Sequence, residues 1–479
     1  MPVSFRYVPD PRFAALGSQF SDPVEPARFP AEIQRFRNDR AAFSVGLEDF
    51  SPAEWQAAFA RFEPLPANQP QPLAMRYHGH QFRTYNPQIG DGRGFLFAQL
   101  REHRTGRLLD LGTKGSGQTP YSRFGDGRLT LKGGVREVLA SEMLEALGVN
   151  TSRSFALFET GEALQRHDEP SPTRGAVLTR LSHSHIRFGT FQRHAALSRP
   201  DLIRTLIDHV AELYYPHLLE LEGEARAVGL LEAVAARSAA LTAGWMAGGF
   251  VHGVLNTDNM NINGESFDYG PYRFLPYNDP GFTAAYFDEN GLYAFGRQAE
   301  AVMWNLQQLA VALSPVCGQE SLIEALQTFG PAYLRALSAA MVARLGLKLR
   351  SEADDAALAG AAFRAISEAG PGLRWEPFFF DWFGGQASEA RAMNGARGAL
   401  YGGEQAQAFR ELMAGYEADM PGRLTQPYFS RPEPEELLYD EIEAIWAPIA
   451  AEDDWSLFEA KLARIGEARQ AWGLDSKPE

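Results

Sequence analysis

Residues 252–259 read His-Gly-Val-Leu-Asn-Thr-Asp-Asn, and residues 268–270 read Asp-Tyr-Gly. The first stretch follows a segment in which apolar residues recur at helical spacing, and the second begins nine residues after Asn259. The two stretches offer two amides and two carboxylates within a short length of chain. Oxygen ligands of this kind suit a divalent cation such as Mg²⁺.

This spacing matches the catalytic loop of kinase-like folds, which has the form H-x-D-x-x-x-x-N and is followed by D-F-G. His252 and Asn259 stand seven positions apart, as that pattern requires, and Asp268 begins the triplet that takes the place of D-F-G. Position 254, where the catalytic base would be, is valine, and an isopropyl group cannot accept a proton. The pattern therefore predicts that the metal-binding half of the site is present and that the usual base is absent.

Further parts of a nucleotide site precede this segment in the expected order. A Gly-x-Gly-x-Gly run at 90–94 predicts a loop whose backbone N–H groups can approach phosphates. Lys114 at a strand end is predicted to pair with Glu137 on the next helix, because a positioned ammonium stabilises phosphate charge better than a mobile one. Arg180 and Arg187 add donors suited to a terminal phosphate.

Each of these parts has an ordinary structural explanation when it is taken alone. The glycine run is more often a turn than a phosphate loop, and Lys114 lacks the Gly-Lys-Ser/Thr context of a Walker A loop. Glu137 could be an exposed helix carboxylate, and the two arginines could form structural salt bridges. Asp258 and Asn259 could be capping or turn residues. The ordered set is much harder to obtain by chance than any member, so it favours a nucleotide site.

Composition bounds the class of protein. The chain has 479 residues, of which 45% are hydrophobic and 12% aromatic, as in well-packed globular proteins. Its net charge of −15 argues against nucleic acid as the main partner, because phosphate backbones require clustered Lys and Arg. The single cysteine, Cys317, excludes an intramolecular disulfide and is predicted to be a buried apolar residue in a helical region. Without a signal-peptide pattern or an apolar run of about 18 residues, we expect a cytoplasmic protein with no membrane span.

The order of predicted elements indicates two lobes. Residues 1–90 are interrupted by prolines and are expected to be irregular, with short helical pieces such as 52–62. Strands are expected at 95–102, 107–112, 154–159 and 176–181, with a helix at 135–147. Helices dominate afterwards, at 201–221, 230–248, 297–313 and 321–345. We therefore predict an α+β fold with a β-rich lobe over residues 1–190, a helical lobe over residues 191–479 and a cleft between them.

Other kinds of site are less well supported. Zinc ligation by the His78/His80 or His183/His185 pair lacks any cysteine or downstream Glu/His spacing to complete it. Ser/His/Asp catalysis lacks a Gly-x-Ser-x-Gly elbow. The aromatic run at 378–383 has a single carboxylate and is expected to pack helices together rather than to bind substrate.

Three longer strings make the match to one family specific. They are Asn86-Pro87-Gln88-Ile89-Gly90-Asp91-Gly92-Arg93-Gly94, Gly112-Thr113-Lys114-Gly115-Ser116-Gly117-Gln118-Thr119-Pro120-Tyr121-Ser122-Arg123 and His252-Gly253-Val254-Leu255-Asn256-Thr257-Asp258-Asn259-Met260. With them the chain resembles, over nearly its whole length, the selenoprotein O family, also called YdiU. Members of this family are pseudokinases that act as protein adenylyltransferases.

The resemblance implies a bilobal, protein-kinase-like fold that holds ATP inverted, with the γ-phosphate buried and the α-phosphate facing the acceptor. AMP would join a Ser, Thr or Tyr hydroxyl of a protein substrate, and pyrophosphate would leave. The resemblance further implies a Mg²⁺ or Mn²⁺ cofactor held by Asn259 and Asp268, with Asp258 as the proton acceptor and Glu137 paired with Lys114. The nucleotide-binding residues that it implies are Gly90, Gly92, Arg93, Lys114, Asp126, Gly127, Arg180, Arg187 and Asp268.

Two alternatives stay open, and one feature departs from the family. The same fold could serve a phosphotransferase or a uridylyltransferase that prefers Mn²⁺ and UTP, or a catalytically dead scaffold that senses nucleotide. A complete set of Lys114, Glu137, Asn259 and Asp268 argues against the scaffold. Some members carry a C-terminal selenocysteine or cysteine, whereas residues 475–479 here read Asp-Ser-Lys-Pro-Glu, so we expect no thiol regulation there. We expect a monomer whose partners are ATP and proteins, not nucleic acid or membrane.

Overall fold

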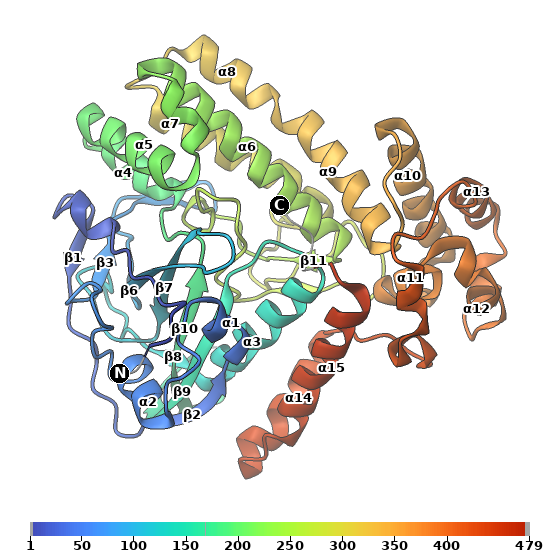
Figure 1. Cartoon of the computed structure of the whole chain (residues 1–479), viewed down its shortest axis with the longest axis horizontal. Helices are drawn as coiled ribbons and strands as arrows, with labels where there is room; N and C mark the ends of the chain where they lie inside the picture. The colour runs from blue at the N-terminus through green and yellow to red at the C-terminus, as the bar shows by residue number, and fades with distance from the viewer. Residues whose placement is uncertain (1–2, 168, 475–479) are drawn as a thin grey trace.

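The computed structural model describes residues 3–167 and 169–474, so the C-terminal residues 475–479 lie outside the described chain. The fold is a mixed α/β arrangement built around an antiparallel sheet. Figure 1 shows the strands of the main sheet gathered at one end of the molecule, helices α6–α9 beside them, and α10–α13 at the other end.

The main sheet has eight strands, in the order β1-β3-β6-β7-β10-β9-β2, with β8 pairing to β10 beside this path. Every pairing in it is antiparallel. The strands are β1 (Ser21–Pro23), β2 (Ile33–Arg37), β3 (Leu73–Met75), β6 (Leu96–Arg101), β7 (Leu108–Lys114), β8 (Leu129–Thr130), β9 (Arg153–Leu164) and β10 (Thr173–Ser182). Two small sheets accompany it, the hairpin of β4 (Gly79–Gln81) with β5 (Thr84–Asn86) and the pair β11 (Phe250–Val251) with β12 (Arg273–Phe274).

The four strands predicted from the sequence are present, but the expectation of an irregular first 90 residues is wrong. That region holds the strands β1–β5. The short helical piece predicted at 52–62 is confirmed as α2 (Pro52–Phe59), and a second short helix, α1 (Asp39–Ser44), precedes it. Its strands are three to five residues long. Two of them pair with partners far along the chain, β1 with β3 and β2 with β9. Strands this short show almost no alternation of apolar and polar residues, so the sequence pattern does not reveal them.

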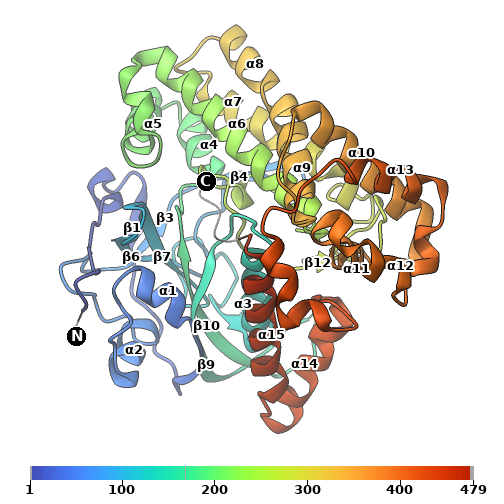
Figure 2. The same cartoon turned by 45° about the vertical axis from the view of Figure 1, so that its right-hand side comes forward.

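Helix α3 (Leu131–Ala146) packs against the sheet and carries Glu137. It begins four residues before the predicted start, because the Thr130 side chain accepts a hydrogen bond from the Gly133 amide and caps the helix. Its residues Val135, Leu139 and Met143 recur every four positions and are buried. The C-terminal helix α15 (Ser456–Trp472) lies beside α3, as Figure 2 shows.

The helical part begins with α4 (Phe188–Ala196), α5 (Pro200–Tyr214), α6 (Gly223–Ala247) and α7 (Gln298–Leu313). The helix predicted at 201–221 ends at Tyr214, because Pro216 has no N–H to continue the ladder and starts a 3-10 turn instead. The helix predicted at 321–345 is two helices, α8 (Gln319–Gln327) and α9 (Phe329–Arg344), and Pro331 in the first turn of α9 explains the break.

Helix α6 is long and apolar enough to cross a membrane, by length and composition alone. Its most apolar window is 61% buried inside the protein, where it packs against α7, α8 and α9. A core helix has the same properties. Among the described residues no other helix meets this measure.

The rest of the chain forms α10 (Glu352–Ala369), α11 (Trp375–Trp382), α12 (Glu389–Asn394), α13 (Glu404–Met413) and α14 (Tyr439–Glu452). The aromatic run falls mostly on α11, whose residues are all buried. Phe378, Phe379 and Trp382 pack in a hydrophobic core shared with α10 and α13, so the predicted packing role is confirmed. Cys317 is buried as predicted, but it lies between α7 and α8 rather than within a helix.

Candidate functional site

A cavity of about 720 Å³ collects most of the residues singled out in the sequence. Its walls come from the glycine run, the ends of β7 and β10, the loop after β7 and the segment around Asp258. The predicted residues that line it are Gly90, Gly92, Arg93, Lys114, Asp126, Gly127, Arg180, Arg187, Asp258 and Asp268. Glu137 and Asn259 are not among the lining residues.

Lys114 is the centre of the charged group in this cavity. Its Nζ donates a hydrogen bond to Glu137 of α3, so the predicted pairing is present, and it lies 2.5 Å from Asp268 Oδ1. Arg180 Nη1 lies 3.6 Å from the same Asp268 oxygen and 3.9 Å from Glu137 Oε2. Lys114 is 4% exposed and Glu137 2%, so this network is shielded from water on the side of the sheet.

Asp268 is held in an unusual conformation at the cavity wall. Its φ of +66° lies in the left-handed region, which costs free energy for a residue other than glycine, and such strain collects at functional sites. His252 supports this turn, because its Nε2 donates to the Phe267 carbonyl at 2.9 Å. Burial alone would raise the pKa of Asp268, but Lys114 and Arg180 outweigh burial and hold that pKa well below its usual range. The carboxylate is therefore an anion that faces the cavity.

Arg180 of β10 and Arg187, which follows that strand, have guanidinium N–H groups without a hydrogen-bond acceptor in the described part of the protein. Arg180 Nε and Nη1 and Arg187 Nε are buried and have no hydrogen-bond partner among the described residues. Arg187 donates instead to the Asp258 carbonyl at 2.7 Å, and its guanidinium stacks on the rings of Tyr77 and Phe267. Buried guanidinium N–H groups without acceptors are costly, so their presence beside a cavity indicates that an anion completes the site.

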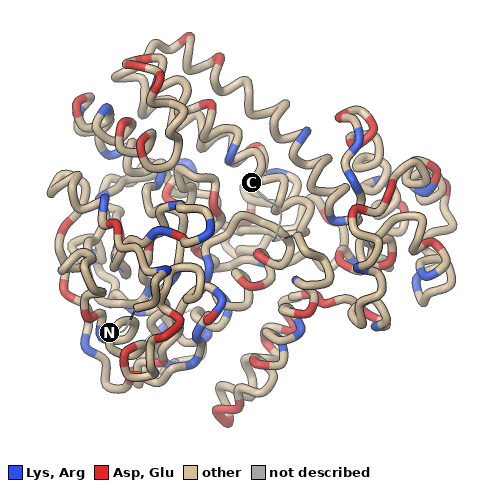
Figure 3. The backbone as a smooth tube through the Cα atoms, viewed as in Figure 1, with Lys and Arg blue, Asp and Glu red and all other residues tan. Residues whose placement is uncertain are grey.

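This concentration of cationic side chains is local. Lys and Arg are scattered among acidic residues over the described chain, whose full sequence has a net charge of −15 (Figure 3). Within the cavity, Arg93, Lys114, Arg180 and Arg187 all line one space. A triphosphate carries several negative charges over a short length, and a cluster of this kind matches it.

Asp258 lies in a 3-10 turn, Thr257–Asn259, that follows directly after Asn256. Its Oδ1 is buried and has no hydrogen-bond partner among the described residues. Burial raises the pKa of Asp258 to about 6, although the nearby Arg187 opposes the shift. An unpartnered carboxylate with a pKa near neutrality is chemically suited to accept a proton.

Asn259 does not line the cavity itself. Its Nδ2 donates to the carbonyl of Val254 at 2.9 Å, so the amide spans the turn back to the position where a kinase base would be. That bond fixes the orientation of the amide and leaves Oδ1 as its acceptor atom. Sequence spacing could not show this bond, because spacing gives the number of residues between two positions and not the contacts that their side chains make.

The glycines at 90–94 are explained by close packing. A Cβ at Gly90 would lie 2.4 Å from the Tyr121 ring, and a Cβ at Gly94 would lie 2.1 Å from the Thr113 carbonyl oxygen. The loop is thus pressed against β7 and the loop that follows it. Asp91 between these glycines was not singled out from the sequence, yet its buried carboxylate accepts from the Met75 amide at 3.0 Å and lies 3.4 Å from Arg187 Nη2.

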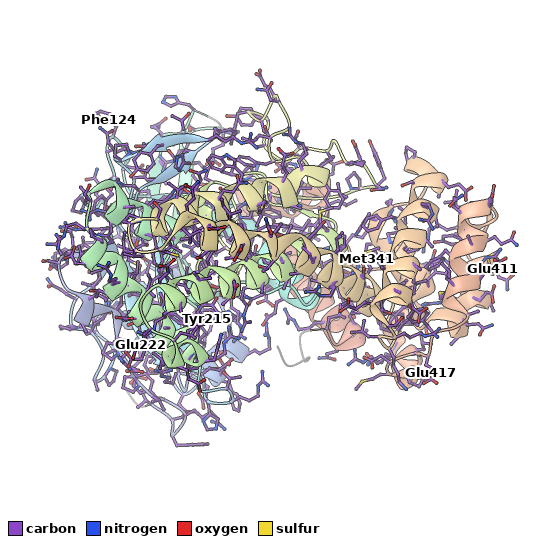
Figure 4. The ribbon with its side chains drawn as sticks, turned by 90° about the horizontal axis from the view of Figure 1, so that it is seen from above. Phe124, Tyr215, Glu222, Met341, Glu411 and Glu417 are labelled. Atoms are coloured by element: carbon purple, nitrogen blue, oxygen red, sulfur yellow. The ribbon has the colours of Figure 1, made fainter. Side chains whose placement is uncertain are left out.

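Sequence reasoning also missed the outer wall of the cavity. Gln165 and Arg166 line it from the turn between β9 and β10, and Phe124 lines it from the loop after β7. Arg166 pairs with Asp126 at 2.8 Å, which outweighs burial and lowers the pKa of that carboxyl. Phe124 is fully exposed and stands at the edge of the molecule, far from Glu411 of α13 (Figure 4). Its position directly after the string at 112–123 was the one available signal.

A divalent cation would find few protein ligands here. Among residues 3–167 and 169–474, no three or more His, Cys, Asp or Glu side chains gather to hold a metal. Mg²⁺ is, however, usually bound by one or two carboxylates together with substrate phosphates and water. The carboxylate of Asp268 and the amide oxygen of Asn259 fit that donor set.

The histidine pairs considered for zinc are engaged in other contacts. His78 Nδ1 hydrogen-bonds the Tyr85 hydroxyl at 2.7 Å, and His80 Nδ1 accepts from Gln192 at 2.9 Å. His183 Nδ1 accepts from Arg107 at 2.8 Å, and His185 lies 3.3 Å from Asp110.

Comparison with known proteins gives a consistent picture. A family model described as protein adenylyltransferase SelO matches residues 4–466. A protein nucleotidyltransferase YdiU of Synechococcus elongatus is 44% identical, over 95% of this chain and 94% of its own. The protein of the same name from Gloeobacter violaceus is 46% identical over 95% and 94%, and that of Synechocystis is 51% identical over 71% and 70%.

Proposed function

The chain belongs to the protein adenylyltransferase SelO family and is a protein nucleotidyltransferase, and from this premise we propose that it transfers AMP from ATP to Ser, Thr or Tyr hydroxyls of proteins. One observation carries the proposal. Val254 stands where a kinase has its base, while Asp258, with an unpartnered carboxylate oxygen, lines the same cavity as Lys114 and Arg180. The acceptor hydroxyl would therefore be activated from a different side than in a kinase.

The charged residues support an inverted ATP. Arg180 and Arg187 are buried, and their unpartnered N–H groups would take the γ-phosphate. Lys114, fixed by Glu137, would contact the phosphates next to it, and the glycine run with Arg93, Asp126 and Gly127 would border the rest of the nucleotide. With the terminal phosphate held inside, the α-phosphate faces outward.

In the proposed reaction AMP moves from ATP to the acceptor hydroxyl. The acceptor oxygen forms a bond to the α-phosphorus, the bond from that phosphorus to the β-phosphate oxygen breaks, and pyrophosphate leaves. Asp258 accepts the hydroxyl proton. Asn259 and Asp268 would hold the Mg²⁺ or Mn²⁺, which supplies positive charge to the phosphate oxygens. Such reactions depend mainly on positioning and charge neutralisation, so moving the base is compatible with the site.

The proposal includes a bilobal, kinase-like fold, with residues 1–190 as the β-rich lobe and residues 191–479 as the helical lobe. It is supported by the strands of the main sheet, all of which end by Ser182, and by the predominance of helices from α4 onward. The residues of the cavity come from both parts, Lys114 and Arg180 from the sheet, and Asp258 and Asp268 from the later segment.

ATP labelled at the α-phosphate or at the γ-phosphate distinguishes the candidate reactions. We expect protein in a heat-inactivated cell extract to acquire label from α-labelled ATP and none from γ-labelled ATP, because only AMP transfer retains the α-phosphate. Transfer of the γ-label would identify a phosphotransferase, and preferential labelling by α-labelled UTP would identify a uridylyltransferase. If neither label is transferred while ATP still raises the melting temperature, the protein is a nucleotide-sensing scaffold.

A substitution at Arg180 tests the site of the γ-phosphate. Arg180→Met keeps much of the side-chain volume and removes the buried donors, so we expect ATP affinity to fall about 10-fold or more. Affinity for AMP should change less than twofold, because AMP has no γ-phosphate. Isothermal titration with each nucleotide measures both values. Equal weakening of ATP and AMP binding would place Arg180 away from the terminal phosphate.

A further inference from the structure

The β4–β5 hairpin lies directly against the turn that carries Asp258. A Cβ built on Gly79 would lie 3.0 Å from Thr257 Oγ1 and 3.4 Å from Asp258 Cβ. The His80 amide donates to Thr257 Oγ1 at 2.7 Å, and the Phe82 amide donates to Asn256 Oδ1 at 3.0 Å. The hairpin tip is therefore bonded to Asn256, which stands two positions before the proposed catalytic residue Asp258.

A second segment meets the hairpin at the same point. The Tyr293 hydroxyl donates to Asn256 Oδ1 at 2.8 Å, so one amide oxygen holds both the hairpin and this segment. The Asp288 carboxylate accepts from the amides of Leu292 and Tyr293, each at 2.8 Å, and closes the loop before Tyr293 into a turn. The backbone beneath the surface is thus held by buried and half-buried hydrogen bonds.

Three aromatic side chains from these two segments form a surface cluster, which we call the aromatic patch: Phe82, Tyr286 and Phe287. Ring centroids lie 5.8 Å apart for Phe82 and Phe287, and 5.1 Å apart for Tyr286 and Phe287. The three side chains are 39%, 83% and 46% exposed, respectively. Clustered aromatic rings left in water above a fixed backbone are typical of contact sites for other proteins, where such residues supply most of the binding energy.

The aromatic patch adjoins the nucleotide cavity through the residue that precedes Phe82. Gln81 precedes Phe82 in the hairpin and lines that cavity. On its other side Tyr286 borders a separate hollow of about 490 Å³, lined also by Thr283, Asp288, Glu289, Ala294 and Arg297. A chain lying across the three rings would run from this hollow toward Gln81 at the cavity. The rings span roughly three residues of extended polypeptide.

We propose that the aromatic patch docks the protein substrate, as an extended segment that places an apolar side chain within about three residues of its acceptor hydroxyl. This inference rests on the proposed function. The relatives are named protein nucleotidyltransferases, and a protein acceptor has to bring its hydroxyl to Asp258 from outside the cavity. The patch adjoins the Asp258 turn through Asn256 and contacts no part of the triphosphate cluster around Lys114.

The test measures AMP incorporation into a library of synthetic peptides, each with one central Ser and one varied position near it. With the wild-type chain we expect rates to rise when Leu or Phe replaces Asp at a position within three residues of the Ser. The Tyr286→Ser/Phe287→Ser double variant should raise the KM for the preferred peptide about 10-fold or more and erase that preference. The KM for ATP should stay within twofold.

Two further variants make the result specific. Tyr286→Ser alone should also raise the KM for the preferred peptide. Its side chain is 83% exposed, so loss of folding cannot explain that rise. Phe5→Ser changes a 78% exposed ring near the N-terminus, outside the aromatic patch, and should leave both KM values unchanged.

An unaltered peptide KM in the double variant would overturn the proposal. Labelling of extract proteins but of no peptide would overturn the extended segment as occupant, and a wild-type dimer dissociated by the double variant would show that a second copy covers the patch. Absence of AMP transfer to any acceptor would overturn the proposed function itself.

Discussion

Replacing Asp268 with alanine is expected to abolish AMP transfer, with kcat/KM falling by at least about 10³-fold. The carboxylate of Asp268 lies 2.5 Å from Lys114 Nζ and 3.6 Å from Arg180 Nη1. Without it, Lys114 keeps only Glu137, and the proposed cation loses its one charged protein ligand. We expect metal-dependent binding of ATP to disappear as well, measured as the rise in melting temperature that Mg²⁺ and ATP cause together.

Two further variants serve as controls for this experiment. Asp268→Asn keeps the shape of the side chain and removes its charge, so it should be as inactive as the alanine variant while remaining folded. Asp39→Asn alters an acid whose side chain is 76% exposed and far from the cavity, and it should behave as the wild type. If Asp268→Ala retained both activity and the metal-dependent shift, Asp268 would have no place in the metal site.

Replacing Asp258 with alanine is expected to reduce kcat by about 10²- to 10⁴-fold, the range that a general base contributes. Affinity for ATP should change only a few-fold. The reason lies in the contacts of this residue, because Arg187 binds the backbone carbonyl of Asp258 at 2.7 Å and that contact survives any side-chain substitution. The carboxylate oxygen Oδ1, in contrast, has no hydrogen-bond partner among the described residues and stabilises nothing that binding needs.

Single-turnover rates and ATP titrations on Asp258→Ala and Asp258→Asn separate the two effects. Both variants should bind ATP and transfer AMP slowly, since neither alanine nor an amide accepts the proton at neutral pH. Equal losses in turnover and in ATP affinity would argue that Asp258 orders the nucleotide and is not the base.

Much of the candidate site was accessible from the sequence because its parts are local motifs with fixed backbone requirements. The spacing of His252, Asn259 and Asp268 belongs to one loop and one turn, and the predicted contact between Lys114 and Glu137 joins a strand end to the next helix. Short-range geometry of this kind is set by chain connectivity. The roles assigned to these residues stay predictions until the variants are measured.

Other features escaped sequence reasoning for identifiable reasons. Helix ends at Tyr214 and Gln327 were set by single prolines, which a periodicity of apolar residues overlooks. Strands β1 and β2 pair with β3 and β9, which lie far along the chain, and nothing within three to five residues indicates a distant partner. Phe124 and Arg166 line the cavity from loops whose approach depends on the packing of the whole sheet.

The amino-acid sequence alone determined the family, the order of the motifs and the absence of a carboxylate at Val254, because these depend on which side chains are present and how far apart they stand along the chain. The tertiary structure decided that Lys114 and Asp268, 154 residues apart, meet within 2.5 Å, and that Phe82 and Phe287 share a surface beside Asp258. Contacts between distant segments arise only when burial of the common core brings those segments together, and no local pattern encodes that distance.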